Sequence, residues 1–271
     1  MSFSIKNPLS EPTPLVVEVP HAGLEVDAQA LATLAAPARS LGADADLYVD
    51  ELYADAPDEG AALISARVSR YVCDLNRAEG DVDALAVEGG TARSSPHGLV
   101  WRTTTEGRPA LLSAIPRSEY ERRLDLYHRP YHRAVRELLE ERRQRFGFAV
   151  LLCAHSMPSR GRDGHDDAGV ERADIVPGTR GRTTANAQVI DLVDRLSRKA
   201  GFVVTHDEPY RGGFSTAHYG RPKDGIHAVQ VELARRLYMD EKTLAKRAPE
   251  FAKLRTFCRS LVQALGSVSV R

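Results

Sequence analysis

Two histidines of the sequence stand at the ends of strongly apolar segments. His21 follows the run Leu15–Val19 after one proline, and His155 follows the run 148–153 after one alanine. A histidine in such a place is more often a capping or surface residue than a metal ligand. Two imidazoles brought together with one carboxylate, however, would form a three-ligand zinc site with an open position for catalysis.

The carboxylate for such a site has several candidates in the segment 42–51, which contains Asp44, Asp46 and Asp50. Acidic residues also favour helix N-termini, because the helix dipole and the free N–H groups attract negative charge. The sequence leaves both interpretations open, a metal ligand and a helix cap.

Glu232 is an acidic residue inside an apolar run, 229–233. In a strand with alternating faces, Glu232 and Gln230 would share one face and the apolar residues would take the other. Glu232 is therefore either on a solvated strand face or held in a site as a general base.

Side chains suited to bind a carboxylate occur at Arg70 and at the pair Asn76-Arg77. A guanidinium can hold a carboxylate through two parallel hydrogen bonds, and an adjacent amide adds a donor. An isolated Asn-Arg pair is a weak signal, so its meaning depends on what else the fold brings beside it.

A second group of donors lies in the segment 210–222. Two adjacent glycines there are flanked by Arg211, His218 and Arg221. The segment is either a surface turn or a lid that recognises an anion, since glycine hinges and exposed cations suit a binding loop.

A rival metal pattern, His128-x-x-x-His132, places two rings on one face of an expected helix. It lacks the glutamate that follows the first histidine in zinc-protease helices. We therefore interpret His128 and His132 as surface or packing residues.

The elements that must position these residues alternate between strands and helices. This alternation predicts an α/β fold in a single domain, residues 1–271, with a mostly parallel central sheet flanked by helices. Near-continuous apolar runs suit strands covered on both faces, and the expected strands are Leu15–Val19, 61–68, 148–153, 202–205 and 227–233. The carboxyl ends of parallel strands meet at one edge, where α/β proteins bind ligands.

Helices are expected between these strands. Apolar residues at three- and four-residue spacing predict a helix over 119–145, kinked or divided by Pro130. Thr183 or Thr184 would cap a helix ending at Lys199, with Gly201 just beyond it. A terminal helical region is expected over 240–264. Two long polar segments, 78–116 and 156–182, follow strands and are expected to be functional or disordered loops.

Composition excludes several classes of function. Lys+Arg and Asp+Glu number 37 each, so no global field favours nucleic acid or an anionic membrane. The three cysteines lie far apart and are odd in number, which argues against a disulfide framework and suits a reducing cytoplasm. No signal peptide or membrane-spanning run is recognisable. The expected partner is a small anionic molecule, and the oligomeric state is not predicted.

Several of these motifs in this order resemble the N-formylglutamate amidohydrolase (deformylase) family, a distant relative of the zinc carboxypeptidases and aspartoacylases. The resemblance runs from about residue 16 to 241. It rests on Pro20-His21-Ala22-Gly23, Asp44-x-Asp46, the segment 69–77 with Asp74-Leu75-Asn76-Arg77, Arg129-Pro130-Tyr131-His132, Ala154-His155-Ser156, the segment 212–222, and 225–233 with Glu232.

This resemblance implies that one divalent metal ion, expected to be zinc, binds His21 and His155. It makes Glu232 the counterpart of the catalytic glutamate. In the expected reaction, Arg70 would help zinc to stabilise the tetrahedral oxyanion. The acidic ligand of carboxypeptidases would fall at Leu24 here, with Glu25 one residue later. Asp46 is preferred, because it belongs to a motif of the family.

The resemblance also implies the substrate. Asn76 and Arg77 would hold one carboxylate, and residues of the 210–222 segment, Arg211, His218 and Arg221, would contact the rest of a dianionic substrate. The expected reaction is zinc-dependent hydrolysis of N-formylglutamate to formate and glutamate, as in histidine degradation. Cys153, where many members have aspartate, departs from the family pattern. The alternatives are another N-acyl amino-acid deacylase, a zinc carboxypeptidase, or a non-catalytic dicarboxylate-binding protein.

Overall fold

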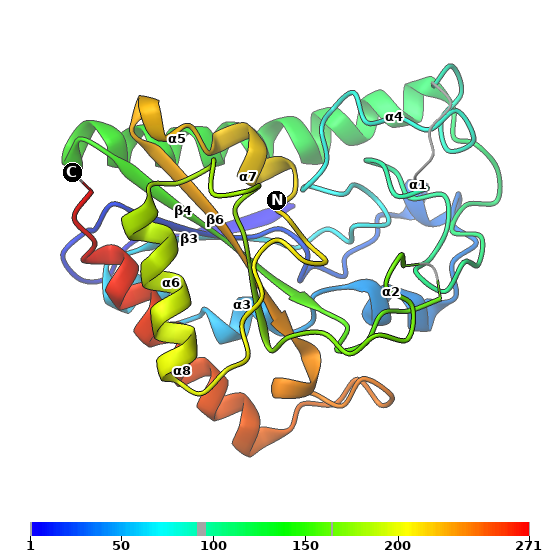
Figure 1. Cartoon of the computed structure of the whole chain (residues 1–271). Coiled ribbons are helices and arrows are strands. Elements are labelled where there is room, and N and C mark those ends of the chain that lie inside the picture. The colour runs from blue at the N-terminus through cyan, green and yellow to red at the C-terminus, as the bar shows by residue number, and fades with distance from the viewer. Residues whose placement is uncertain (1, 91–95, 164, 271) are drawn as a thin grey trace.

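A computed structural model of the chain describes residues 2–90, 96–163 and 165–270, and has one mixed sheet of six strands at its centre (Figure 1). The strand order is β1-β3-β2-β4-β6-β5. Neighbours among β3, β2, β4 and β6 are parallel, whereas β1 and β5 run antiparallel at the two edges. The strands are β1 (Phe3–Lys6), β2 (Leu15–Val19), β3 (Ala62–Ala66), β4 (Ala149–Met157), β5 (Ile175–Gly178) and β6 (Ile226–Ala234).

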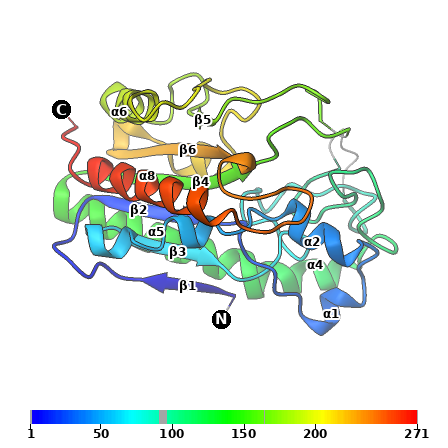
Figure 2. The same cartoon turned by 90° about the horizontal axis from the view of Figure 1, so that it is seen from below.

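Helices cover both faces of this sheet (Figure 2). Apolar side chains of α3, α6 and α8 pack with one set of strand residues, which includes Val17 and Leu152. Those of α4 and α5, with Tyr219 of α7, pack with the opposite set, which includes Val16 and Leu151. Burial on both faces explains why β2, β3, β4 and β6 are buried along their whole length. The α-helices are α1 (Ala28–Leu31), α2 (Ala38–Asp44), α3 (Val49–Leu52), α4 (Arg117–Arg123), α5 (Arg129–Phe146), α6 (Ala187–Lys199), α7 (Phe214–Tyr219) and α8 (Ala248–Gly266).

The predicted α/β class, with one mostly parallel sheet flanked by helices, is confirmed, and four of the five expected strands form. The exception is 202–205. Val204 makes only an isolated bridge to Ile175 of β5, and the neighbouring Val203 is exposed. The outer place in the sheet is taken by β5, which was not among the expected strands and contains Pro177 and Gly178. Both residue types are tolerated at a sheet edge.

The helix predictions hold in outline and differ at the ends. Between α4 and α5, one turn of π-helix (η2, Leu124–His128) stands where a kink was expected, just before Pro130. Such a turn accommodates the missing proline N–H. α6 ends at Lys199 as predicted, but its cap is Asn186, whose side chain accepts from the Gln188 N–H. α8 begins only at Ala248.

Short 3₁₀ turns complete the chain: η1 (Ala56–Glu59), η3 (Pro222–Asp224) and η4 (Arg235–Leu237). The three cysteines are free and buried, as their spacing suggested. Within the described residues, no helix is both long enough and apolar enough to cross a membrane.

Candidate active site

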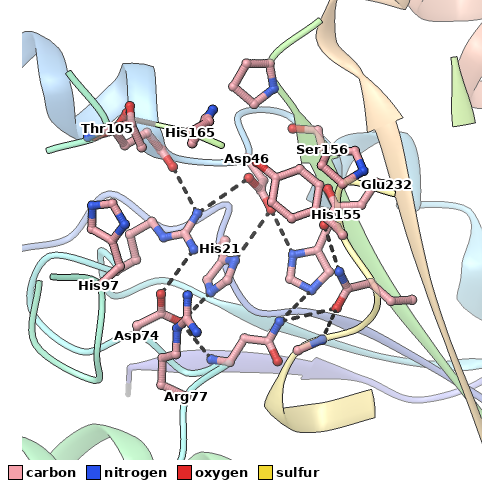
Figure 3. Close-up of a pocket in the computed structure, with 18 of the residues that line it drawn as sticks. His21, Asp46, Asp74, Arg77, His97, Thr105, His155, Ser156, His165 and Glu232 are labelled. Carbon is pink, nitrogen blue, oxygen red and sulfur yellow. Dashed lines mark hydrogen bonds and ion pairs between the residues drawn. The ribbon is translucent and has the colours of Figure 1, made fainter. Parts of the chain in front are cut away.

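The carboxyl ends of three parallel strands bring the main candidate residues together. His21 lies just beyond β2, His155 lies in β4, and Glu232 of β6 is paired in register with His155. The segment with Asp46 is held against the end of β2, because the Asp46 N–H donates to the His21 carbonyl at 3.0 Å. Figure 3 shows His21, Asp46 and His155 turned toward one another.

These three side chains form a group that could hold a metal ion. Asp46 Oδ2 lies 3.0 Å from His155 Nδ1 and 3.6 Å from His21 Nδ1. One ligand atom from each residue lies within 4.8 Å of the others, and all three residues are buried. Two imidazoles and one carboxylate form a donor set that suits a divalent transition metal, and zinc in particular.

Asp74 orients His21 from behind. Its Oδ1 lies 2.7 Å from His21 Nε2, and its Oδ2 accepts hydrogen bonds from Arg70 and from the indole N–H of Trp101. Although burial opposes it, the charges of His21 and Arg70 hold the pKa of Asp74 well below its usual range. A carboxylate bonded to the outer nitrogen of a metal-ligating histidine fixes the ring and leaves the inner nitrogen free to ligate.

Asp46 is fixed in a similar way by Arg235. The Arg235 guanidinium lies 3.3 Å from Asp46 Oδ1 and donates to the carbonyl of Ala45 at 2.7 Å. Burial would raise the pKa of Asp46, but the interactions with His155 and His21 outweigh it and hold the pKa well below its usual value. Asp46 is therefore ionised and ready to ligate a cation.

Glu232 shares a strand face with Gln230, as the alternation of the strand predicts. Gln230 Nε2 donates to Glu232 Oε1 at 2.8 Å, and both residues line the same cavity. Burial raises the pKa of Glu232, and the nearby charge of His155 only partly offsets this. A buried carboxylate beside a metal group is suited to accept and hold a proton.

The cavity around these residues has a volume of about 310 Å³ and is rich in cationic side chains. Asn76, Arg77 and Arg211 line it, together with Arg70. Within the described residues, the guanidinium groups of Arg77 and Arg211 make no hydrogen bond or ion pair, whereas Arg70 is held by Asp74. In Figure 3, Arg77 lies on one side of the three candidate ligands, and Thr105 and His165 lie on the other.

Sequence comparison decides the family. The sequence pattern of the family described as N-formylglutamate amidohydrolase matches residues 13–239. The chain belongs to this family. N-formylglutamate deformylase of Pseudomonas putida is 35% identical over 231 residues, which are 84% of this chain and 82% of that protein. The enzyme of the same name from Pseudomonas aeruginosa PAO1 is 32% identical over 256 residues, which are 93% and 92% of the two chains.

Solved structures agree with this assignment to the N-formylglutamate amidohydrolase family. The N-formylglutamate amidohydrolase of Ralstonia eutropha JMP134 is 31% identical, with a TM-score of 0.90 over 98% of this chain and 97% of that one. A gene product of Agrobacterium tumefaciens, 20% identical over 98% and 95% of the two chains with a TM-score of 0.68, shares the fold. The present chain is an amidohydrolase of this family that acts on a linear amide.

The other acidic candidates of this amidohydrolase do not join the group of His21, Asp46 and His155. Asp44 is buried, but its carboxylate is bonded to Tyr71, Thr105 and Arg162. Glu25 is exposed and pairs with Arg67. Asp50 is exposed at the start of α3.

Two of the expected substrate-binding residues do not line the cavity. His218 is exposed on α7 and stacks on Phe214 at 4.8 Å between ring centroids. Arg221 is also exposed and lies 3.7 Å from Asp224. The α7 helix turns this part of the expected lid away from the site, while Arg211, before the two glycines, stays at the cavity.

His128 and His132 are packing residues, in line with their interpretation. His132 Nδ1 lies 2.9 Å from the Tyr219 hydroxyl and its Nε2 lies 2.9 Å from the Leu75 carbonyl. His128 Nε2 lies 2.9 Å from the carbonyl of Arg77. Both histidines therefore support the loop that carries Asn76 and Arg77.

Sequence reasoning gave no role to several residues of this site. Asp74 belongs to the family-like motif 69–77, and Arg235 follows β6 directly, so motif membership and a strand end were usable signals for them. The remaining ones come from the two long polar segments, whose contribution to a site was expected but whose individual residues carried no signal: His97, Trp101, Thr105, Arg162 and His165.

Proposed function

We propose that this amidohydrolase hydrolyses N-formylglutamate to formate and glutamate with one zinc ion held by His21, Asp46 and His155. The observation that carries the proposal is one cavity in which a buried His-Asp-His group stands beside Glu232 and two arginines, Arg77 and Arg211, whose guanidinium groups have no partner among the described residues. The named relatives support the same substrate. The free cysteines suit a reducing compartment such as the cytoplasm.

The side chains of His21, Asp46 and His155 suit zinc in two respects, which are their donor atoms and the hydrogen bonds that hold them in place. When bound, zinc supplies Lewis acidity, which polarises an amide carbonyl and makes water a stronger acid. Asp74 holds His21 in place, and Arg235 holds Asp46. Such hydrogen bonds to the ligating side chains raise the affinity of a site for its metal.

Glu232 is the proposed general base and acid. Its carboxylate takes a proton from the attacking water and then delivers that proton to the leaving amine. The burial that raises its pKa helps it keep the proton between the two steps. Gln230 fixes one carboxylate oxygen, so the other is left to act.

Arg70 is the proposed partner of the developing oxyanion. Its guanidinium is held by Asp74 and by the carbonyl of Asp44 at 3.1 Å, and it lies 4.3 Å from the centroid of the Trp101 ring. A donor fixed in this way stabilises new negative charge without reorganising during the reaction.

Asn76 and Arg77 are proposed to hold the α-carboxylate of the glutamyl part, and Arg211 the side-chain carboxylate. His218 and Arg221 have no part in this arrangement, because they lie outside the cavity. Positioning energy from two carboxylates is available only to a dianion, so neutral N-acyl compounds should react poorly.

The test combines metal analysis with formate release, using protein purified without added metal. We expect about one zinc per chain, and loss of activity on chelation that zinc restores. Glu232→Gln should keep the metal but lose activity by about 10²- to 10⁴-fold. N-formylglutamine, which lacks only the side-chain charge, serves as the matched substrate.

Three results would count against the proposal. Activity of metal-free protein would show that no metal ion is needed, and a fully active Glu232→Gln variant would show that Glu232 is not the general base. Binding of glutamate without turnover of any N-acyl amino acid would make the chain a dicarboxylate-binding protein, whereas turnover of another N-acyl amino acid alone would keep the chemistry and change the substrate.

A further inference from the structure

Glu18 is a carboxylic acid inside the sheet that the proposed reaction does not use. It lies in β2, three residues before His21, and is fully buried on the face that α5 and α7 cover. Its neighbours on that strand face are apolar core residues such as Val16. An acid in such a place needs a reason, because burying a carboxyl group costs free energy that an apolar residue would not cost.

The contacts of Glu18 show that it acts as a hydrogen-bond acceptor. Its Oε1 accepts from the Ser215 hydroxyl at 2.9 Å. Its Oε2 and the Tyr131 hydroxyl, both buried, have no hydrogen-bond partner within the described residues. Burial raises the pKa of Glu18, and the hydrogen bond from Ser215 and the charge of His155 only partly offset this. Its surroundings therefore favour the uncharged acid.

Ser215 connects Glu18 to the substrate-binding loop. The Ser215 backbone N–H donates to Asn76 Oδ1 at 2.9 Å, and the N–H of Phe214 donates to the Asn76 carbonyl at 3.3 Å. Gly213 allows this close approach, because a Cβ there would lie 2.3 Å from Asn76 Nδ2. The first residues of α7 therefore hold both the backbone and the side chain of Asn76.

These bonds decide which end of the Asn76 amide faces the site. Since Oδ1 is taken by Ser215, Nδ2 points to the cavity side, 3.2 Å from His155 Nε2 and 3.5 Å from Gln230 Oε1. Gln230 Oε1 also accepts from the Gly213 N–H at 2.8 Å, and its Nε2 donates to Glu232. Hydrogen bonds thus run without interruption from the core to the proposed base.

We propose that Glu18 is a positioning residue, which anchors Ser215 from inside the core and so fixes the Asn76 amide with its nitrogen on the cavity side. The inference rests on the proposed role of Asn76. It differs from a packing role in one respect. A packing residue could be replaced by an apolar one of similar size without loss, whereas a positioning acceptor could be replaced only by another acceptor.

Three variants separate these possibilities. Glu18→Gln keeps an uncharged acceptor of the same shape, Glu18→Leu removes the acceptor, and Ser215→Ala removes the donor. Each variant is compared with wild type for its thermal midpoint, its zinc content, and kcat and KM for N-formylglutamate. Glu18→Leu removes the cost of burying a carboxyl group but leaves the buried Ser215 hydroxyl without its acceptor, so the thermal midpoint alone does not report the positioning role. The kinetic constants are therefore measured beside it.

We expect Glu18→Gln to stay within about twofold of wild type in kcat/KM. Glu18→Leu should raise KM by about tenfold, which is the upper end of the range for one net hydrogen bond, with zinc content unchanged. Ser215→Ala should raise KM in the same direction by about threefold to tenfold, and it gives the answer if Glu18→Leu does not fold.

The inference would be overturned by a Glu18→Leu variant with the wild-type KM, or by a Glu18→Gln variant as impaired as Glu18→Leu. If Glu18→Leu does not fold, a wild-type KM in Ser215→Ala overturns it. These results differ from failure of the proposed function, in which wild-type protein itself would release no formate from N-formylglutamate.

Discussion

The two sides of the cavity hold their charges in opposite ways. On the metal side, Asp46 and Asp74 are buried and each has a cationic partner, Arg235 and Arg70. On the substrate side, Arg77 and Arg211 line the cavity with guanidinium groups that have no partner within the described residues. Both sides carry arginine, but only one side has carboxylates of its own to neutralise it.

This difference separates arginines that position from arginines that bind. A buried charge needs a partner, and removal of one member of a buried pair typically costs about 3–5 kcal/mol because it leaves the other charge uncompensated. An unpaired guanidinium that lines a cavity has no internal partner to lose. We therefore expect substitutions on the metal side to change stability and metal content, and substitutions on the substrate side to change recognition alone.

The largest effect is expected for Asp46→Ala. The variant loses the only carboxylate of the proposed metal group and leaves Arg235 without its carboxylate partner. We expect zinc content to fall to a small fraction of one per chain, formate release to fall by about 10³-fold or more, and the thermal midpoint to drop. Elemental analysis, kinetics and thermal unfolding measure the three quantities.

Asp50→Ala is the matched control for this prediction. Asp50 comes from the same acidic segment but is exposed, so its loss should leave zinc content and activity within about twofold of wild type. Full zinc occupancy in Asp46→Ala, or equal losses in the two variants, would show that the metal side is not built as we propose.

A smaller effect is expected for Arg77→Met, which keeps the length of the side chain and removes its charge. Hydrogen bonds to charged groups contribute about 1.5–3 kcal/mol, so kcat/KM should fall by about 10- to 150-fold. Because Arg77 has no ion-pair partner in the described part of the chain, zinc content and the thermal midpoint should stay as in wild type. A variant that loses zinc together with activity would contradict the separation of the two sides.

The sequence predicted the positions of His21, His155 and Glu232 better than those of the residues expected to bind substrate. His21, His155 and Glu232 all lie near the carboxyl ends of apolar parallel strands, and such ends meet wherever the strands pair. The strand pattern was strong enough to place them. The order of the strands, the antiparallel edges and the bridge at Val204 depend on long-range pairing, which local sequence does not contain.

The choice between Asp44 and Asp46 shows where sequence reasoning stops. The two residues are two positions apart in one polar segment, and no periodicity distinguishes them. Contacts with distant segments determine where each carboxylate lies. Asp46 is hydrogen-bonded to His21, whereas Asp44 is hydrogen-bonded to Thr105 and Arg162. The same holds for His218 and Arg221, which the short helix α7 turns away from the cavity.

The smallest effect, and the sharpest comparison, concerns Arg211. Arg211 is exposed at the rim of the cavity, so solvent weakens its interaction with a carboxylate. We expect Arg211→Met to lower kcat/KM for N-formylglutamate by about threefold to tenfold and to leave N-formylglutamine nearly unchanged. Arg221→Met, an exposed arginine outside the cavity, should change neither substrate.

The two arginines of the substrate side can then be told apart by the same pair of substrates. Both substrates carry the α-carboxylate, so Arg77→Met should impair them equally, whereas Arg211→Met should reduce only the preference for the dianion. If Arg211→Met impairs both substrates alike, Arg211 binds the α-carboxylate or acts through the loop, and selection for the side-chain charge must come from another cation of the cavity. Arg162 is then the next residue to vary, although its guanidinium is bonded to Asp44 and its loss should also lower the thermal midpoint.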